Sequence, residues 1–403
     1  MSALRRLAYF SPLPPERSGI ADYSAELLPY LAELARVTLF TAQPEQVAAE
    51  LQTAFAVRSI SDYGPESSRY DIAVYHMGNS MYHEAMYHVL LRYPGITVLH
   101  DHGLHHFMAT RTLPRGDFAG YAREMGYVLG AEGVDLAYRI RHGQAEYPLF
   151  TVSLSERVLD HSLGVIVHSH YAQHRIREVR PNLPVSVVPA PIRTSLGPLR
   201  SRAELGCPED ALVFASAGQV ISIKQITSAL EAFARLRGDF PHARYVVIGA
   251  ELNPDLDLQT WLQERDFGDA VISTGYLADT RDFVSWIAAA DVLVNLRYPT
   301  VGETSATALR GLAAGRPVIV SDHGWYAELP DNACIKVAPN DSEAVYQAMR
   351  RLAGDATARR EIGQRAAAYA QREHSLDTAA RRYLDFIEET FRRTTSVLAQ
   401  SVP

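Results

Sequence analysis

The sequence predicts an α/β protein made of two doubly wound domains, in which helices cover both faces of a parallel sheet. Three observations support this prediction. The chain has 403 residues, which suits two hydrophobic cores better than one. In both halves, short apolar runs rich in β-branched residues alternate with longer segments of helical period. A stretch dense in Pro and Gly, residues 189–210, lies between the two halves.

Each predicted strand is one of these short apolar runs, and helices are predicted between them, for example at 22–35 and 81–92. In the first half the strand segments are residues 6–11, 36–41, 71–78, 96–102, 164–169 and 185–190. In the second half they are residues 212–218, 244–250, 270–275, 291–296, 317–322 and 334–339. We therefore expect a first domain over residues 1–190, a second over 191–374, and a final amphipathic helix over 375–403 that begins at the N-cap Ser375.

The charge balance gives no general attraction to nucleic acid or to an anionic membrane, since 39 Lys and Arg residues stand against 46 Asp and Glu residues. The two cysteines, Cys207 and Cys334, lack the spacing of a metal site or a CxxC motif. No apolar signal segment and no 18-residue apolar stretch occurs. We expect a soluble cytoplasmic protein without a nucleic-acid partner. Peripheral contact with a membrane stays open, because it leaves little trace in composition.

In open parallel sheets, ligands bind beyond the carboxyl ends of the strands, so the segments that follow the strands are where chemistry is expected. The first half has a proline-rich loop that ends at Gly19, just before a helix whose N-terminus can face an anion. It also holds seven of the chain's 15 histidines, between His76 and His106. These histidines lack a carboxylate or cysteine partner at a recognised ligand spacing, so we expect no metal site.

His100 and Asp101 directly follow a predicted strand, and we interpret them as residues that line a cleft and exchange hydrogen bonds with substrate hydroxyls. Their neighbours in the segments 76–80 and 100–107 include the candidate acceptor contacts His76, Asn79 and His102. The alternative is a buried imidazole that the backbone satisfies. This alternative is stronger for the two histidines at 105 and 106.

The second half offers two candidate contacts for an anion. A predicted strand ends at Gly218, and Lys224 lies at the predicted start of the next helix, where its ammonium can contact a diphosphate. The GETS motif starts a helix near Thr304 or Ser305, whose free amides and hydroxyls suit phosphate oxygens. The carboxylate of Glu303 repels phosphate, so we assign it to neutral sugar hydroxyls. A plain N-cap and a solvated lysine are the alternatives.

Together these segments resemble family 4 of the retaining glycosyltransferases, which have the GT-B fold. The resemblance is carried by PPERSGIADYS, GNSMYHEAMYHVLLRYPGITVLHDHGLHH, VHSHYAQ, SAGQVISIKQ, TGYLADT, AADVLVNLRYPTVGETS and GLAAGRPVIVSD. It implies two Rossmann-like domains facing across a cleft, with a UDP- or GDP-sugar donor in the second domain and the acceptor in the first. It also implies that no metal or other cofactor is needed, and that the terminal helix crosses back to the first domain.

By the same resemblance, Lys224 neutralises the donor diphosphate, the amides of Thr304 and Ser305 cradle it, and Glu303 grips the donor sugar. Gly19 lets the N-terminal loop close over the phosphates. The segment 274–278 lies beside the base, so the further donor contacts are Gly218, Gln219, Thr274, Gly275 and Tyr276. The residues expected to act in catalysis are His100, Asp101, Lys224 and Glu303, and those expected to bind the acceptor are His76, Asn79 and His102.

The sequence departs from the family pattern at two positions. Gln219 stands where members of the family commonly carry an arginine, and Arg310 stands where they carry a second glutamate. The spacing from Glu303 to Arg310 is also one residue shorter than the usual separation of the two glutamates. The resemblance therefore implies a diphosphate site with one positive charge fewer and without the usual carboxylate contact to the ribose.

The activity implied is transfer of a hexose from a nucleoside-diphosphate sugar to an acceptor hydroxyl, with retention of configuration. The acceptor is a glycan, a lipid-linked molecule or a small molecule, and the segment 110–162 is expected to shape its pocket. Two alternatives stay open. One is a catalytically degenerate protein that binds nucleotide sugars without transfer, motivated by Gln219 and Arg310. The other is a sugar-nucleotide epimerase or a phosphorylase of the same architecture.

Overall fold

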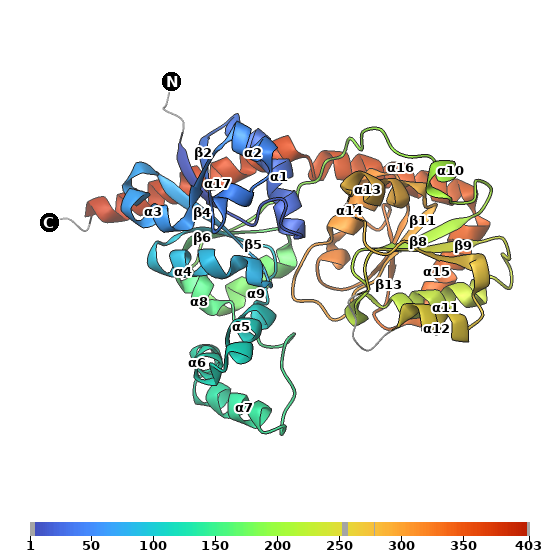
Figure 1. Cartoon of the computed structure of the whole chain (residues 1–403), viewed down its shortest axis with the longest axis horizontal. Coiled ribbons are helices and arrows are strands. Elements are labelled where there is room, and N and C mark those ends of the chain that lie inside the picture. Colours follow the sequence, from blue (N-terminus) through green and yellow to red (C-terminus); the bar gives the residue numbers. More distant parts are fainter. Residues whose placement is uncertain (1–4, 252–256, 278, 401–403) are drawn as a thin grey trace. The chain divides into compact units, whose positions relative to one another are not determined.

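The computed structural model describes residues 5–251, 257–277 and 279–400. Position 278, the last of the segment predicted beside the base, lies outside these residues, as do positions 1–4 and 401–403 of the predicted domains. The chain divides into two compact units, each with a sheet and flanking helices (Figure 1). The first unit comprises the residues up to Pro191, Val301–Thr304 and the residues from Leu376 onward; the second comprises Ile192–Thr300 and Ser305–Ser375.

The first unit is built on a seven-stranded parallel sheet with the order β3-β2-β1-β4-β5-β6-β7. Its strands are β1 (Arg6–Phe10), β2 (Arg36–Thr41), β3 (Ala56–Ser59), β4 (Ile72–Met77), β5 (Gly95–Leu99), β6 (Ser162–Val167) and β7 (Val185–Val187). The central strands β4 and β5 are buried along their whole length, which explains their continuous apolar sequences. The strand order reverses between β1 and β4, so polar residues are expected to gather there.

Helices cover this sheet and also extend beyond it. They are α1 (Gly19–Ala32), α2 (Ala49–Ala54), α3 (Ile60–Glu66), α4 (Glu84–Arg92), α5 (His105–Thr112), α6 (Phe118–Leu129), α7 (Ala131–Arg141), α8 (Glu156–Asp160), α9 (His170–Val179) and α17 (Leu376–Gln400). In Figure 1, α6 and α7 form a hairpin away from the sheet. Gly126 and Gly133 let these two helices pack closely, since a Cβ on Gly126 would lie 2.8 Å from a methyl of Val134.

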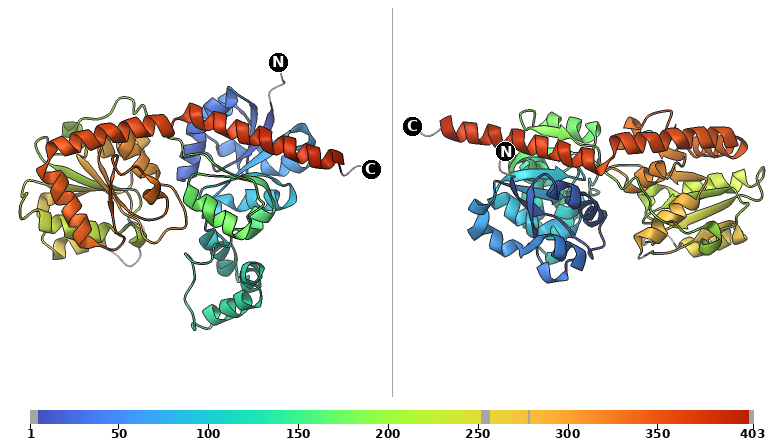
Figure 2. Two further views of the ribbon diagram at one scale, coloured as in Figure 1. Left: turned by 180° about the vertical axis from the view of Figure 1, so that it is seen from behind. Right: turned by 90° about the horizontal axis from the view of Figure 1, so that it is seen from above.

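The last helix, α17, packs against the first unit and completes one of its two core clusters (Figure 2). Tyr383 and Ile387 are fully buried beside residues of β1 and β5, and Phe386 lies so close to Gly164 of β6 that a Cβ there would be 2.9 Å from its ring. Arg5 and Glu388 form an ion pair at 2.7 Å beside the start of β1. The helix is therefore an integral part of the first unit.

The second unit is built on a six-stranded parallel sheet with the order β10-β9-β8-β11-β12-β13. Its strands are β8 (Val213–Ala217), β9 (Arg244–Ile248), β10 (Val271–Ser273), β11 (Val292–Asn295), β12 (Val318–Ser321) and β13 (Ile335–Val337). Its helices are α10 (Arg202–Leu205), α11 (Ile226–Leu236), α12 (Leu258–Glu264), α13 (Thr280–Ala289), α14 (Ala306–Ala313), α15 (Ser342–Gly354) and α16 (Ala356–Glu373). Here the strand order reverses between β8 and β11.

The predicted fold class is confirmed, because both units are parallel sheets in α/β order, and every predicted strand segment overlaps an observed strand. Several strands end earlier than predicted. The segment predicted as a strand over 96–102, for example, leaves the sheet after Leu99, so that His100 and Asp101 stand beyond its edge. Among the described residues, the helices are too short or too polar to cross a membrane.

Candidate functional site

The second unit has a compact turn at the carboxyl ends of the neighbouring strands β8 and β9. Gly218 follows β8 with φ +99°, and Gly249 follows β9 with φ +134°, a backbone region that favours glycine. A Cβ on Gly249 would overlap the carbonyl oxygen of Gly218 and lie 2.8 Å from its carbonyl carbon. The two backbones therefore touch, and only glycine fits at position 249.

Lys224 places its ammonium against this glycine turn. It ends the short 3-10 helix η5 (Ser222–Lys224), and its Nζ lies 3.5 Å from the carbonyl oxygen of Ala217, the last residue of β8. A Cβ on Gly218 would collide with that Nζ and would lie 3.6 Å from the hydroxyl of Thr307 in the first turn of α14. One positive charge and the N-terminal turn of α14 thus meet at the carboxyl edge of the sheet.

The GETS motif leads into α14 as the sequence predicts. Ser305 is the N-cap: its hydroxyl accepts a hydrogen bond from the amide of Ala308 at 3.1 Å and donates one to Asn295 Oδ1 at 3.1 Å. The side chain is only 8% exposed, so this hydroxyl is committed to the protein. The donors that α14 can offer to an anion are therefore the backbone amides of its first turn, which lack partners within a helix.

The segment after β10 lies beside the same turn. Gly275 pairs with Gly249 in an isolated antiparallel bridge, and the hydroxyl of Thr274 accepts from the amide of Gly249 at 3.3 Å and donates to the carbonyl of Gly275 at 3.0 Å. Tyr276 is 52% exposed and Gln219 is exposed as well. The predicted donor residues Gly218, Gln219, Lys224, Thr274, Gly275, Tyr276 and Ser305 therefore all belong to the carboxyl edge of one sheet.

The first unit has a cluster of aromatic and imidazole rings at the equivalent edge of its own sheet. His76 Nδ1 and His100 Nε2 share a hydrogen bond of 3.0 Å. His168, directly after β6, lies with its ring centroid 5.0 Å from that of His100, and its Nδ1 is 2.8 Å from the carbonyl of Val188. Tyr23 of α1 packs edge-on against His100 at 4.8 Å. Three strands and one helix therefore hold His100 in a fixed position.

Burial keeps these imidazoles neutral. Desolvation and the neighbouring His168 hold the pKa values of His76 and His100 well below the ordinary value. Behind them, Tyr23 and Tyr383 of α17 share a hydrogen bond of 2.5 Å between their hydroxyls. A neutral imidazole can either donate or accept a hydrogen bond, so this edge suits uncharged hydroxyl groups.

Asp101 and Asn79 hold the two loops that follow β4 and β5 together. The carboxylate of Asp101 accepts from the amide of Asn79 at 2.7 Å, and the side-chain oxygen of Asn79 accepts from the amide of Phe107 at 2.8 Å. Gly78 lies in this junction, since a Cβ there would be 3.0 Å from His83 Nε2 and 3.1 Å from Asp101 Oδ2. Desolvation lowers the pKa of His83 to about 4, so it is neutral here.

His102 lies in the first unit, and the loop Val301–Thr304, which contains Glu303, belongs to the same unit. The carbonyl of Val301 accepts from the amide of Gly103 at 2.8 Å, and one carboxylate oxygen of Glu303 accepts from the amide of Val301 at 2.8 Å. His102 is 8% exposed, and desolvation lowers its pKa to about 4. Glu303 therefore shapes its own loop with one carboxylate oxygen, and Thr304 ends that loop just before α14 begins.

Other predicted residues take structural positions. Gly19 is the exposed first residue of α1, where the hydroxyl of Ser18 accepts from the amide of Ile20 at 3.2 Å. His105 links α5 to the α6 region, because its two ring nitrogens contact the carbonyl of Val152 and the hydroxyl of Tyr121, each at 2.9 Å. Within residues 5–251, 257–277 and 279–400, no group of three His, Cys, Asp or Glu side chains is arranged to hold a metal ion.

Sequence reasoning missed three residues of these two edges. His168 lies in the segment VHSHYAQ. The position of this segment at the end of an apolar run could have identified His168 as a residue at a strand end. Gly249 follows the apolar residues of the run RYVVIGA, and Thr307 lies two residues beyond the GETS motif. None of the three has a local pattern that assigns it a partner, because each contact joins segments that are distant in sequence.

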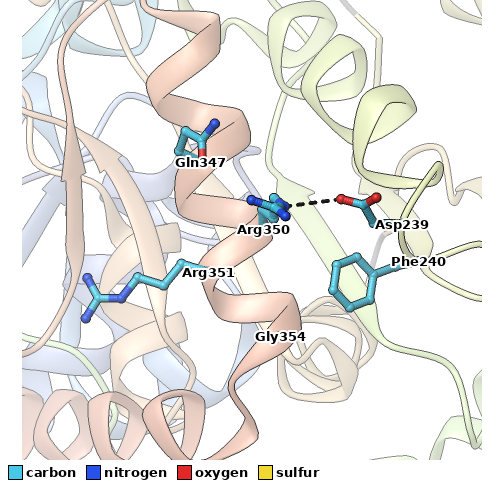
Figure 3. Close-up of a pocket in the computed structure, with 6 residues that line it drawn as sticks. All are labelled: Asp239, Phe240, Gln347, Arg350, Arg351 and Gly354. Atoms are coloured by element: carbon cyan, nitrogen blue, oxygen red, sulfur yellow. Dashed lines mark hydrogen bonds and ion pairs between the residues drawn. The ribbon is translucent and has the colours of Figure 1, made fainter.

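The second unit also has surface pockets away from the Lys224 turn. One of about 430 Å³ is lined by Asp239 and Phe240, which precede β9, and by residues of α15 (Figure 3). Arg350 points across it toward Asp239 and pairs with it at 3.1 Å, whereas Arg351 points away. This pocket is at the amino edge of the sheet, so it is separate from the Lys224 turn.

Two parallel-sheet units of this topology define the GT-B architecture of glycosyltransferases. Residues 210–355, which span most of the second unit, match the family described as Glycosyl transferases group 1. This match confirms the prediction of a glycosyltransferase at the level of that domain. No curated protein matches the chain.

Solved structures of the same architecture match nearly the whole chain. Sucrose-phosphate synthase from Thermosynechococcus elongatus has a TM-score of 0.71 at 16% identity, covering 96% of this chain and 100% of its own. Anabaena Alr3699/HepE in complex with UDP has a TM-score of 0.67 at 14% identity, with the same coverage. WaaG, a glycosyltransferase involved in lipopolysaccharide biosynthesis, has a TM-score of 0.62 at 14% identity, covering 94% and 99%. At such identities the likeness concerns the fold.

Proposed function

We propose that the protein transfers a hexose from a nucleoside-diphosphate sugar to an acceptor hydroxyl, with retention and without a metal ion. The observation that carries the proposal is the ammonium of Lys224, held at the Gly218 turn beside the first turn of α14. This edge of the sheet has one lysine and a helix N-terminus, which suit a diphosphate. The family match of residues 210–355 and the UDP and UDP-glucose complexes of the structural neighbour HepE support this donor class.

In the proposed reaction, the bond from the anomeric carbon to the diphosphate oxygen breaks, and that oxygen keeps the electron pair. An oxygen of the acceptor forms the new bond to the same carbon. Lys224 and the amides of α14 stabilise the charge that develops on the departing diphosphate, so that no cation is required. Retention follows the family resemblance of the sequence, and the segment that contains Gly275 and Tyr276 would lie beside the base.

The acceptor is assigned to the ring cluster of the first unit. His100 is the candidate that orients the acceptor hydroxyl, because its pKa is lowered by burial and it remains a neutral hydrogen-bonding group. The same lowered pKa makes it a weak proton acceptor. The proton of the acceptor hydroxyl therefore goes to Asp101 or to a phosphate oxygen of the donor. By the resemblance of the GETS motif, Glu303 would contact hydroxyls of the donor sugar.

A second candidate is a protein that binds nucleotide sugars without transfer. It is favoured by Gln219, which is exposed at the turn where an arginine would add charge, and by Arg310 within α14 in place of a glutamate. The two candidates agree on donor binding and differ on turnover. A transfer assay with a donor that is known to bind therefore separates them.

The first test is thermal unfolding with nucleoside diphosphates and nucleotide sugars in the absence of metal. A ligand at a hundred times its dissociation constant stabilises the fold by about 2.7 kcal/mol. We expect a selective shift with one donor that Lys224→Ala abolishes. Lys336, the chain's other lysine, is the matched control, because it lies on β13 and pairs with Asp331 at 2.7 Å. A panel without any selective shift contradicts the proposal.

A further inference from the structure

A second concentration of positive charge lies at the opposite, amino edge of the sheet in the second unit. Two pockets of about 420 Å³ each share Asp291, just before β11, and Arg316, just before β12. The arginines that line one or both pockets outnumber the carboxylates Asp291 and Glu209, and they are Arg200, Arg202, Arg316, Arg359 and Arg360. The chain as a whole has a formal charge of −7, so this local excess of arginine runs against its average.

Arg316 is the centre of this arrangement. Its Nε is buried and has no hydrogen-bond partner among the residues that the structure describes. The nearest carboxylate, that of Asp291, is already paired with Arg202 at 2.9 Å and accepts the amide of Val213 at 2.8 Å. Burial lowers the pKa of Arg316, which shows that its charge is poorly solvated there. A buried N–H of a guanidinium that lacks a hydrogen-bond acceptor is costly, and the oxygen of an anion would offset that cost.

The neighbouring helix adds further donors. Arg359 and Arg360 lie in the first two turns of α16 and line one of the pockets, together with Gln364. Nη1 of Arg359 already donates to the carbonyl oxygens of Leu352 and Ala353, so its contribution to the pocket comes from its charge and its other nitrogens. Arg360 is exposed and its guanidinium is 3.5 Å from the hydroxyl of Thr357, so most of its donors are available. In the pocket of Figure 3, by contrast, Arg350 is neutralised by Asp239 at 3.1 Å. The Arg316 pockets differ from that pocket, because they combine a guanidinium nitrogen that lacks a partner with further arginines.

We propose that Arg316, with Arg359 and Arg360, binds a phosphate group, either inorganic phosphate or a small phosphomonoester. Planar guanidinium groups match the oxygens of phosphate with paired hydrogen bonds, which favours this anion over chloride. The pocket volume admits a phosphate that carries a small organic group. The site is separate from the Lys224 turn, because Arg316 precedes β12 whereas Lys224 follows β8. It therefore does not depend on the proposed transferase activity.

Isothermal titration calorimetry of the full chain tests this proposal. The probes are sodium phosphate and glycerol phosphate, at constant ionic strength. We expect saturable binding at one site per chain. It should weaken at least tenfold in Arg316→Gln and about threefold in the exposed variant Arg360→Gln. Arg372→Gln is the matched control, since Arg372 is an exposed residue on the same helix α16 and lies outside the pocket. Tighter binding of glycerol phosphate than of phosphate identifies a phosphomonoester as the ligand, and the reverse identifies phosphate itself.

Two results overturn the proposal. One is the absence of saturable binding, or binding that Arg316→Gln and Arg360→Gln leave unchanged. The other is binding that Lys224→Ala abolishes while Arg360→Gln does not affect it, which would place the phosphate at the glycine turn of β8. Far-ultraviolet circular dichroism of Arg316→Gln shows whether that variant folds. Arg360 is exposed and makes a single weak side-chain contact in the described structure, so its variant keeps the test valid if Arg316→Gln does not fold.

Discussion

The two units have the same kind of sheet but fill its carboxyl edge in opposite ways. In the first unit, the edge is packed with rings from three strands and two helices, and His76 and Tyr383 are completely buried there. In the second unit, glycines at 218, 249 and 275 leave the edge without side chains at these positions, and Lys224 lies beside them. The comparison teaches that one architecture can offer neutral, rigid hydrogen-bonding groups or an open cationic turn, depending on which side chains follow its strands.

This difference matches the two reactants of the proposed transfer. An acceptor hydroxyl is uncharged, so a neutral imidazole fixed by its neighbours suits it better than an ion. A departing diphosphate is strongly anionic, so it needs backbone amides and an ammonium that can approach it closely. The glycines serve that approach, because a side chain at 218 would displace the ammonium of Lys224.

The largest expected effect is on turnover at the cationic edge. Lys224→Ala should lower the rate of transfer on the order of 10²- to 10³-fold, because one stabilising contact to the developing charge is lost. Steady-state kinetics with the donor identified by thermal shifts measures this effect. Lys336→Ala should leave the rate within about twofold, since Lys336 is already paired on β13. Equal rates for Lys224→Ala and the native protein would remove the lysine from the reaction.

The second effect tests whether the glycine turn of the second unit depends on the backbone contact between Gly249 and Gly218. Gly249→Ala should destabilise the second unit by about 3 kcal/mol, since the new Cβ overlaps the carbonyl of Gly218 and φ is +134°. Urea unfolding measures this loss. Gly268→Ala is the control: its φ is +55° but a Cβ there meets nothing within 4 Å, so we expect a loss of only about 1 kcal/mol. Equal losses in the two variants would mean that backbone strain alone, without the contact, governs this turn.

The third effect is a difference between the two units in how their stability depends on pH. Desolvation lowers the folded-state pKa of His83 and His102 to about 4, from an ordinary 6.5. Below pH 6.5 these histidines are protonated in the unfolded chain but remain neutral in the folded first unit. The stability of the first unit therefore falls as the pH drops toward 4. The loss is about 1.4 kcal/mol per pH unit for each histidine.

Hydrogen exchange at pH 7.5 and 5.5, resolved by peptide, measures this loss in each unit. Protection factors, which correct for the slower intrinsic exchange at the lower pH, should fall in the first unit and change less in the second, and His83→Asn should weaken the dependence. His242→Gln is the control, because His242 is exposed in the second unit. An equal fall of the protection factors in both units would contradict the assignment to buried histidines.

The smallest expected effect concerns the support behind His100. Tyr383→Phe removes the hydrogen bond to Tyr23 and leaves that hydroxyl without its partner on α17, at a cost of about 1 kcal/mol in unfolding free energy. Tyr30→Phe, at an exposed position of α1, should change nothing measurable. If the two variants unfold at the same urea concentration, the tyrosine pair does not stabilise the ring cluster.

The sequence predicted the sheets well and the contacts across them poorly. Buried central strands such as β4 and β8 are continuous apolar runs, and their patterns identify them. The strand β3 was missed, because it is a four-residue edge strand that is only half-buried and contains an arginine. The predicted positions of His100, Lys224 and the GETS motif at strand ends follow from the same periodicity.

The partners of these residues could not be predicted, because they are set by packing between distant segments. Tyr23 and Tyr383 are 360 positions apart, and the contact of Lys224 with Gly218 depends on a 3-10 turn without a clear signature. The cap formed by Ser305 shows the same limit in another form. Its hydroxyl was predicted to be free for an anion, but Asn295 and the amide of Ala308 occupy it.

The docking of α17 on the first unit has a consequence for synthesis of the chain. The core that surrounds β1 and β5 stays incomplete until residues of α17 such as Tyr383, Phe386 and Ile387 are added, although its residues outside α17 lie before position 191. All residues of the second unit leave the ribosome before this helix does. The domain that is translated first is therefore the last to be completed, and its unfinished apolar surface must remain protected while the other domain folds.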